Sequence, residues 1–457
     1  MAEDDHSRII LVVATIASFF VPYLTSSITV ALPAIGKEFG LDAVSLAWVM
    51  SAYVLSTALA IVPVGRIADI YGRKRIFLAG VVLMTAASLL AFFAWSAPAL
   101  IVFRVIQGIG GAMIFTTSVA IVAAVFPADR RGHALGITLA SVYTGLSLGP
   151  FIGGVLTEHL GWRSLFLVIV PIGSIVIWYT LRRIPGEWID ARGSSFDVTG
   201  SFLYVLGLFG VMFGFTLIPD PLAAVSILFG SIFLAVFLWW ESRCPSPAVD
   251  IGVFRHNAAF TLSNLAALIN YASTYAVAFL LSLFLQYTRE LSPEGAGLIL
   301  VAQPVVQAVF SPAAGRLSDR IEPRIVASAG MGLTAVGLFL CVFIAPTTPL
   351  PWIIGVLILF GFGYGLFSSP NTNAIMSSVE RKYYGVASSM VATMRAIGQL
   401  SSLAITMMIF SLIIGRVQVT PEVYPQFLSS MHLVFAILGS LCVIGTGASL
   451  ARGKIRT

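Results

Sequence analysis

The sequence predicts an all-α integral membrane protein with fourteen transmembrane helices, arranged as two pseudo-symmetric six-helix bundles plus an inserted helical hairpin. Three observations support this prediction: an apolar composition, fourteen long apolar segments and a charged loop that occurs twice. The chain of 457 residues is 58% hydrophobic and 10% charged, with a mean hydropathy of +0.96. A soluble domain carries about 25% charged residues. The bilayer must therefore be the solvent for most of this chain.

The apolar segments define the predicted helices. A spanning helix needs about 20 mainly apolar residues, and only helices or closed barrels satisfy the backbone within lipid. The turn at Pro219-Asp220-Pro221 predicts a tight hairpin between spans seven and eight. The fourteen segments lie at 9–32, 45–66, 75–96, 98–125, 133–157, 163–182, 198–218, 221–241, 257–287, 294–317, 324–345, 349–373, 384–412 and 428–451.

Loop charges predict the orientation. With the N-terminus inside, 20 of the 26 Lys and Arg residues fall on the inner side, and Arg104 and Arg395 lie within spans. Cytoplasmic loops carry such an excess of positive charge. We therefore expect a multi-pass protein of the cell membrane with both termini in the cytoplasm. Orientation in the bilayer explains the net charge of +6 without a nucleic-acid partner, and the three scattered cysteines indicate neither disulfides nor a metal site. The outer side holds Lys37, Arg163, Arg289 and Arg416.

The charged loop after span two recurs in the second part of the chain. The copies Gly65–Arg75 and Gly315–Arg324 both place an acid four residues after the glycine of a Gly-Arg pair. Gly108–Gly110 and Gly361–Gly363 keep the offset near 250. Spans one to six therefore correspond to spans nine to fourteen, as in a parallel repeat. We expect an N-terminal bundle at 1–190, two inserted helices at 191–245 and a C-terminal bundle at 246–457.

The first copy of the loop has the chemistry of a cytoplasmic gate. Its glycines permit close packing and a tight turn. The carboxylate of Asp69 can face the N-terminus of another helix or pair with an arginine, which would latch the cytoplasmic side shut. For the cations, anchoring at the inner surface is the alternative. Because the second copy is degraded, replacing Asp69 should impair switching more than replacing Asp319. The gate residues are Gly65, Arg66, Asp69, Gly72, Arg73 and Lys74.

Several motifs together resemble a known family. Gly65–Arg75 resembles the signature loop of the major facilitator superfamily, and Arg104–Gly108 is similar to its span-four motif. Gly145–Gly154 resembles the span-five motif of its exporters. Leu32-Pro33, Gly161–Arg163 and the fourteen spans resemble the drug:proton antiporter branch, which includes multidrug efflux proteins. The resemblance implies the major facilitator fold, a secondary transporter with alternating access, a small-molecule substrate, protons as coupling ion and no cofactor.

The span-five motif has its own physical logic. Glycines four residues apart form one flat stripe, on which another helix can approach closely. A proline within the helix removes a backbone hydrogen bond and favours bending. Ordinary helix packing is the alternative, but the combination favours a mobile interface. The motif residues are Gly145, Gly149, Pro150, Gly153 and Gly154.

Arg104 is an informative charge near the outer end of span four. Burying an arginine in a bilayer costs on the order of 3 kcal/mol or more, so we expect a cavity or a polar partner. Gln107 lies about one turn on and can share its face. In the family that the chain resembles, an arginine at this position handles protons and substrate. Snorkelling to the outer surface is the alternative.

Arg395 lies deeper, about a dozen residues into span thirteen, so we expect it to line the transport pathway. A structural role shared across the fold is the alternative. Relatives that export cationic drugs often carry an aspartate in span one, where this chain has Thr25, and no Asp or Glu lies in the middle of a span. These features favour an anionic or neutral amphipathic solute. They also leave proton coupling without its usual carrier, so a uniporter, exchanger or importer of an organic anion or neutral metabolite remains the alternative.

Polar and aromatic residues on spans one, two, four and five and their counterparts predict a central cavity. Bonds between neighbouring helices are the alternative for any single one. Gln303 and Gln307 flank Pro304, which should open the backbone locally. The candidates are Tyr23, Thr25, Ser26, Tyr53, Arg104, Gln107, Tyr143, Asn264, Asn270, Tyr271, Tyr275, Gln303, Gln307, Tyr364, Asn371, Asn373, Arg395 and Gln399.

Other function classes fit less well. A membrane metalloprotease needs His-Glu-x-x-His and an ATP-driven pump needs a phosphate loop, and the sequence contains neither string. A receptor or channel would not explain the repeated cytoplasmic corner. We therefore expect a transporter and no enzyme.

Overall fold

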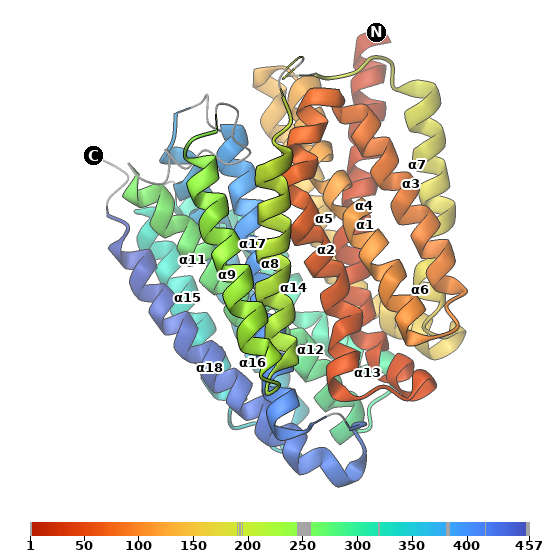
Figure 1. Cartoon of the computed structure of the whole chain (residues 1–457), viewed down its shortest axis with the longest axis vertical. Helices are drawn as coiled ribbons and strands as arrows, with labels where there is room; N and C mark the ends of the chain where they lie inside the picture. Colours follow the sequence, from red (N-terminus) through yellow and green to blue (C-terminus); the bar gives the residue numbers. More distant parts are fainter. Residues whose placement is uncertain are drawn as a thin grey trace.

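The computed structural model describes residues 2–189, 191, 193, 195–244, 257–318, 320–380, 384–415 and 417–453. Asp319 and Arg416 lie outside the described residues, as do the proposed bundle limits at 190, 245 and 246. Within the described part of the chain, fourteen helical segments are long and apolar enough to cross a membrane, which confirms the predicted number. They run side by side as one bundle of long helices (Figure 1).

The first half of the chain forms six membrane-length segments. A short break at Val168 divides the sixth segment into two helices. The helices are α1 (Ala2–Phe39), α2 (Ala43–Tyr71), α3 (Arg73–Phe92), α4 (Ala97–Val125), α5 (Ala128–Leu160), α6 (Ser164–Leu167) and α7 (Ile169–Arg183). The inserted pair follows as α8 (Val198–Leu217) and α9 (Leu222–Glu241).

The second half also forms six segments, two of them interrupted. The ninth span comprises α11 (Ala258–Thr274), α12 (Ala276–Leu283) and the π-helical turn η1 (Phe284–Thr288), and the tenth comprises α13 (Pro293–Leu300) and α14 (Ala302–Ser318). The tenth is interrupted at Val301, near Pro304, where an open backbone was predicted. The remaining helices are α15 (Pro323–Cys341), α16 (Leu350–Ser377), α17 (Tyr384–Ile413), the short η3 (Pro421–Val423) and α18 (Tyr424–Ala451).

Polar side chains fix where several helices begin. The Asp42 carboxylate accepts a hydrogen bond from the Ser45 amide at 2.7 Å, and Asp197 accepts one from the Gly200 amide at 2.8 Å. Asn257 caps α11 in the same way. The first amides of a helix have no partner within the helix, so such caps stabilise its start by about 1 kcal/mol each.

The two halves repeat the same internal packing. In the first half α1 packs on α5, and α4 packs on α2 and α3; in the second half α11 packs on α17, and α16 packs on α14 and α15. A reciprocal glycine contact marks each copy. A Cβ on Gly110 would lie 2.9 Å from the Gly80 carbonyl, and one on Gly363 would lie 2.9 Å from the Gly330 carbonyl. Small residues that let backbones touch are typical of membrane helix interfaces.

The inserted hairpin α8–α9 lies along α2 and α17 (Figure 1). The Tyr204 hydroxyl of α8 donates to the Ala58 carbonyl of α2 at 2.8 Å. At the other end of α8, the Ser411 hydroxyl of α17 donates to the Ile218 carbonyl at 2.6 Å. The hairpin therefore contacts both halves, and its turn lies where Pro219-Asp220-Pro221 was predicted to make one.

The predicted orientation defines the inner and outer ends of the molecule, and these names are kept below. Helix α1 starts at the inner end and α18 ends there, as an even number of spans requires (Figure 1). Three sets of contacts join the halves toward the outer end: α1 with α12, α5 with α13, and the loop before α2 with the loop after α17. We call these contacts together the outer seam.

Candidate functional site

The gate loop occupies the junction of α2 and α3. Asp69 pairs with Arg73 four residues on: its Oδ1 accepts from Nε at 3.1 Å and from Nη2 at 2.9 Å. Gly72 separates the two helices with a φ of 115°, a backbone conformation that favours glycine. Gly65 faces open space, and Arg66 is partly buried with an Nε that makes no hydrogen bond. In this structure Asp69 thus has an arginine partner within its own half.

A segment after α7 straps across the gate loop. We call residues 184–189 and 191 the strap. The Glu187 carboxylate accepts from the Lys74 amide at 2.7 Å and lies 3.6 Å from Arg75. The Arg73 amide donates to the Trp188 carbonyl at 3.0 Å, and the Ala191 amide donates to the Asp69 carbonyl at 3.0 Å. A carboxylate at the start of α3 is favoured, because the unpaired amides there carry partial positive charge.

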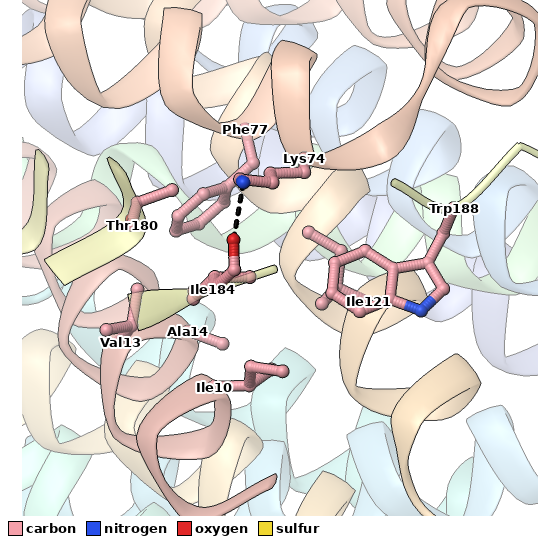
Figure 2. A pocket seen from close by; sticks show the side chains of 9 residues that line it. All are labelled: Ile10, Val13, Ala14, Lys74, Phe77, Ile121, Thr180, Ile184 and Trp188. Carbon is pink, nitrogen blue, oxygen red and sulfur yellow. Dashed lines mark hydrogen bonds between the residues drawn. The ribbon is translucent and has the colours of Figure 1, made fainter. Parts of the chain in front are cut away.

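A small pocket lies beneath the strap. The Lys74 ammonium points across it and donates to the Ile184 carbonyl, while the Trp188 ring covers the opposite side (Figure 2). The pocket is otherwise apolar. Its lining offers few polar groups to a solute. The lining residues are Ile10, Val13, Ala14, Lys74, Phe77, Ile121, Thr180, Ile184 and Trp188.

Arg104 is fully buried and bonded within the first half. Its Nε donates to the Val49 carbonyl at 3.2 Å, and its Nη1 donates to Gln107 Oε1 at 2.9 Å. Gln107 in turn donates to the Ser88 hydroxyl at 3.0 Å. The guanidinium also stands over the Tyr53 ring, 4.4 Å from its centroid. The predicted pairing with Gln107 is therefore present, and the side chain has polar partners at 0% exposure, so it does not snorkel.

Arg395 occupies a different environment at the boundary between the halves. It is partly buried on α17, and its guanidinium stands 5.1 Å from the centroid of the Tyr271 ring of α11. Tyr143, which belongs to α5 of the other half, lies close enough to interact with it electrostatically. The Arg395 Nε is buried without a hydrogen-bond partner. A cation with an unused donor between two tyrosines can bind a carboxylate, a phosphate or a carbonyl oxygen.

Other predicted cavity residues lie on the same helices. Asn270, five residues before the break at Tyr275, is fully buried, and both polar atoms of its side chain lack partners. Gln303 is partly buried and Gln307 is buried on α14, and Gln399 is partly buried one turn beyond Arg395. Asn270 therefore keeps unused hydrogen-bonding capacity inside the second half.

Three further candidates are bonded within their own half or buried against it. The Thr25 hydroxyl donates to the Pro22 carbonyl of its own helix at 2.9 Å, and Tyr23 is buried in α1. Asn371 lies apart, at the inner end of α16: its Oδ1 accepts from Arg452 Nη1 at 2.6 Å, and its Nδ2 donates to the Ser263 carbonyl at 3.1 Å. Burial lowers the pKa of Arg452 to about 10, which leaves it charged at neutral pH.

The span-five glycines pack against two helices. A Cβ on Gly145 or Gly153 would lie 2.7 to 2.8 Å from backbone atoms of Phe19 or Ser27 in α1. Gly149 faces Ser26 of the same helix. Gly154 instead faces the Pro293 carbonyl at the start of α13, and the Pro150 carbonyl touches Gly297. The motif therefore holds α5 against α1 on one face and against the second half on the other.

The outer rim adds polar contacts between the halves. Glu158 at the end of α5 accepts from the Glu294 amide of α13 at 3.0 Å, and His159 lies 3.1 Å from the Glu294 carboxylate. Asp42 and Gln418 form an isolated antiparallel bridge. The seam thus closes the outer end at several depths.

The roles of four residues in these networks were not predicted from the sequence. Glu187 and Arg452 look like ordinary inner-side charges, and nothing in the sequence around them places them beside the gate loop or Asn371. Ser282 and Gln286, which bond to α1, lie on a largely apolar span. The one available signal was Pro33, because a proline within a helix leaves a carbonyl without its helical partner.

Comparisons with known proteins agree with this architecture. A family model described as Major Facilitator Superfamily matches residues 14–243 and 264–452. The chain is 30% identical to the riboflavin transporter RibZ of Clostridioides difficile (strain 630), over 85% of this chain and 84% of that protein. It is 31% identical to the multidrug resistance protein Stp of Mycobacterium tuberculosis (strain CDC 1551 / Oshkosh), over 88% of this chain and 75% of that protein. It is 33% identical to the cephamycin export protein CmcT of Amycolatopsis lactamdurans, over 86% of this chain and 83% of that protein.

Solved structures show the same fold. A bacterial homolog to the human lysosomal transporter Spinster, in an inward-facing and unoccupied conformation, superposes with a TM-score of 0.69 at 17% identity, covering 99% of this chain and 97% of that one. A peptide transporter POT in complex with alafosfalin superposes with a TM-score of 0.70 at 14% identity, covering 95% and 93%. At these identities the likeness concerns the fold alone.

Proposed function

The chain belongs to the major facilitator superfamily, and from this premise we propose that it exports a small amphipathic solute, anionic or neutral, by alternating access. The membership makes it a multi-pass membrane transporter. The direction of transport, the solute class and the coupling ion belong to the proposal. Arg395, with an unpartnered Nε at the boundary between the halves, is the observation that carries it.

The solute class follows from the charges near this boundary. A lipophilic cation would be repelled by Arg395, whereas a carboxylate would gain a charge-assisted hydrogen bond from it. Tyr271 offers an aromatic face beside the guanidinium, and Tyr143 adds a second tyrosine nearby, which suits a planar solute. The names of relatives that transport riboflavin or export cephamycin agree with such solutes.

Proton antiport is the coupling that we propose from the family. Among the described residues, Asp69, Glu158 and Asp197 lie near the ends of spans, so a proton would be carried there and not in the middle of the membrane. The second candidate is an exchanger or importer of organic anions. Arg395 supports it equally, because this cation would bind an anion whichever way the anion is transported. We also propose that the protein lies in the cell membrane with both termini in the cytoplasm, because its loops on that side carry the excess of positive charge.

Transport into inverted membrane vesicles tests these points. Three probes differ in charge: a cephamycin carboxylate, neutral riboflavin and the cation ethidium. We expect accumulation of the carboxylate or riboflavin, driven by an imposed pH gradient with an acidic interior. Flux that ignores the pH gradient would contradict antiport, and accumulation of ethidium alone would contradict the solute class.

Replacing the boundary arginine is the sharper experiment. We expect Arg395→Ala to reduce transport of the carboxylate about tenfold or more, because a charge-assisted hydrogen bond contributes about 1.5–3 kcal/mol. Arg395→Lys should restore part of the flux. Arg289→Ala is the control, since this outer arginine bonds to the Thr348 carbonyl in the loop after α15 of its own half. Equal loss of folded protein in Arg395→Ala and Arg395→Lys would show a structural role instead.

A further inference from the structure

Pro33 leaves one carbonyl of α1 without its helical partner. In an α-helix each amide donates to the carbonyl four residues earlier, and proline has no amide hydrogen. The carbonyl affected by Pro33 is that of Thr29, a residue that is 3% exposed in the outer part of the bundle. A buried backbone carbonyl within a membrane needs a partner from elsewhere.

The second half of the protein supplies that partner. The hydroxyl of Ser282 in α12 donates to the Thr29 carbonyl at 2.9 Å. Ser282 is fully buried, and the hydrogen bond crosses the boundary between the halves. The carbonyl freed by proline in one half is thus satisfied by the other half.

Gln286 extends this contact by one turn. Its Nε2 donates to the Val30 carbonyl of α1 at 2.9 Å and to the Ser282 hydroxyl at 3.0 Å. Gln286 lies within the π-helical turn η1, and such turns occur frequently at functional sites. Six residues further along α1, Gly36 leaves room for Tyr287: a Cβ there would lie 3.3 Å from the Tyr287 hydroxyl.

From these contacts we propose that Ser282 and Gln286 form a hydrogen-bonded lock on α1, built on the Thr29 carbonyl that Pro33 frees, and that this lock favours the outer-closed state. The inference rests on the proposed function in one respect: alternating access requires α1 and α12 to separate when the outer end opens. Separation removes the Ser282 donor from the Thr29 carbonyl, and water then takes its place. Ser282 and Gln286 are positioning residues, since they act on the equilibrium between two states and touch no solute.

Distances across the outer end test the lock without any solute. Spin labels on Leu160→Cys at the end of α5 and Phe343→Cys after α15 report opening, because both positions are exposed and belong to different halves. The native Cys244, Cys341 and Cys442 are replaced by alanine in this background. We expect Ser282→Ala and Gln286→Leu each to raise the ratio of long to short distances about fivefold, which corresponds to the loss of one hydrogen bond of about 1 kcal/mol.

A double-mutant cycle identifies the freed carbonyl as the cause. In Pro33→Ala the new amide can donate to Thr29, so adding Ser282→Ala should change the ratio less than it does in the parent. Ser273→Ala is the matched control, because this buried hydroxyl donates at 2.8 Å to the Ile269 carbonyl of its own helix. It should leave the distance distribution unchanged.

The outcomes separate the lock from the proposed function. Unchanged distances in both Ser282→Ala and Gln286→Leu overturn the lock, as does an equal shift in Ser273→Ala. Either variant decides the matter alone if the other fails to fold. A fivefold shift in a protein that transports none of the three probes supports the lock and contradicts the proposed solute class. Normal anion transport that depends on Arg395, with no shift in distance, contradicts the lock only.

Discussion

Two arginines within spans show how different partners give one residue type different roles. Arg104 uses Nε and Nη1 on Val49 and Gln107 and stacks on Tyr53, all within the first half. Arg395 has a buried Nε without a partner. A buried cation whose donors are paired mainly contributes to stability, whereas one that keeps an unpaired donor at a boundary has capacity left for a ligand.

This contrast predicts a larger loss of stability from alanine at position 104 than at position 395. Arg104→Ala should lower the free energy of unfolding by about 3 kcal/mol, because it removes buried hydrogen bonds and leaves a cavity. Arg395→Ala should lower it by less than about 1 kcal/mol, since fewer bonds are lost. Reaction of a thiol dye with the buried Cys341 and Cys442 reports unfolding. Equal destabilisation by the two substitutions would contradict this assignment of roles.

The sequence could identify both arginines but not their surroundings. Their position within apolar spans marked them as unusual, and the spacing of Arg104 and Gln107 predicted their contact. Tyr143 and Arg395 are far apart in the chain and belong to different halves, and only the tertiary fold brings them together. The pattern of residues within one span does not show which residues of another span lie beside it.

At the scale of elements, the gate loop and the strap form one unit. The strap bonds to the gate loop through two backbone hydrogen bonds, the Glu187 carboxylate and the Lys74 ammonium. The contact of Glu187 with the gate loop could not be predicted from the sequence, because irregular connections between helices carry no periodic signal. Movement of the α2–α3 corner must therefore displace the connection to the inserted hairpin as well.

Two glycines of the gate loop provide a matched pair of substitutions. Gly72→Ala should destabilise the protein by about 1–3 kcal/mol and slow transport, because position 72 has a positive φ and a Cβ there would collide with Glu187. Gly65→Ala should be neutral, since nothing lies within 4 Å of its Cβ position. Thermal unfolding and transport rates of the two variants provide the measurement. Damage from Gly65→Ala equal to that from Gly72→Ala would contradict the structural reason given.

At the scale of the whole molecule, the halves repeat their packing and meet at the outer seam. The count of fourteen spans could be predicted, because long apolar runs are a strong signal in a sequence. The reciprocal contacts Gly80–Gly110 and Gly330–Gly363 give the repeat a physical basis at one interface of each half. The seam itself could not be predicted, since it depends on which conformation the two halves adopt together.

A cross-link over the seam should stop transport. Asp42 and Gln418 face each other in an isolated antiparallel bridge, where Cα atoms lie about 4.5–5.5 Å apart, a spacing suited to a disulfide. In a background without Cys244, we expect Asp42→Cys with Gln418→Cys to lose most of its transport on oxidation and to recover it on reduction. Each single variant is the control. Full transport with a completely oxidised pair would show that the outer end need not open there.

The layered closure of the outer seam also bears on ion leak. A path wide enough for an amphipathic solute would let protons and metal ions run down the membrane potential if both ends opened together. The seam places backbone contacts between α5 and α13, hydrogen bonds on α1 and polar pairs at the rim at different depths. If thermal motion breaks one of these sets of contacts, the others still hold the outer end closed. An idle copy of the protein should therefore cost the cell little of its electrochemical gradient.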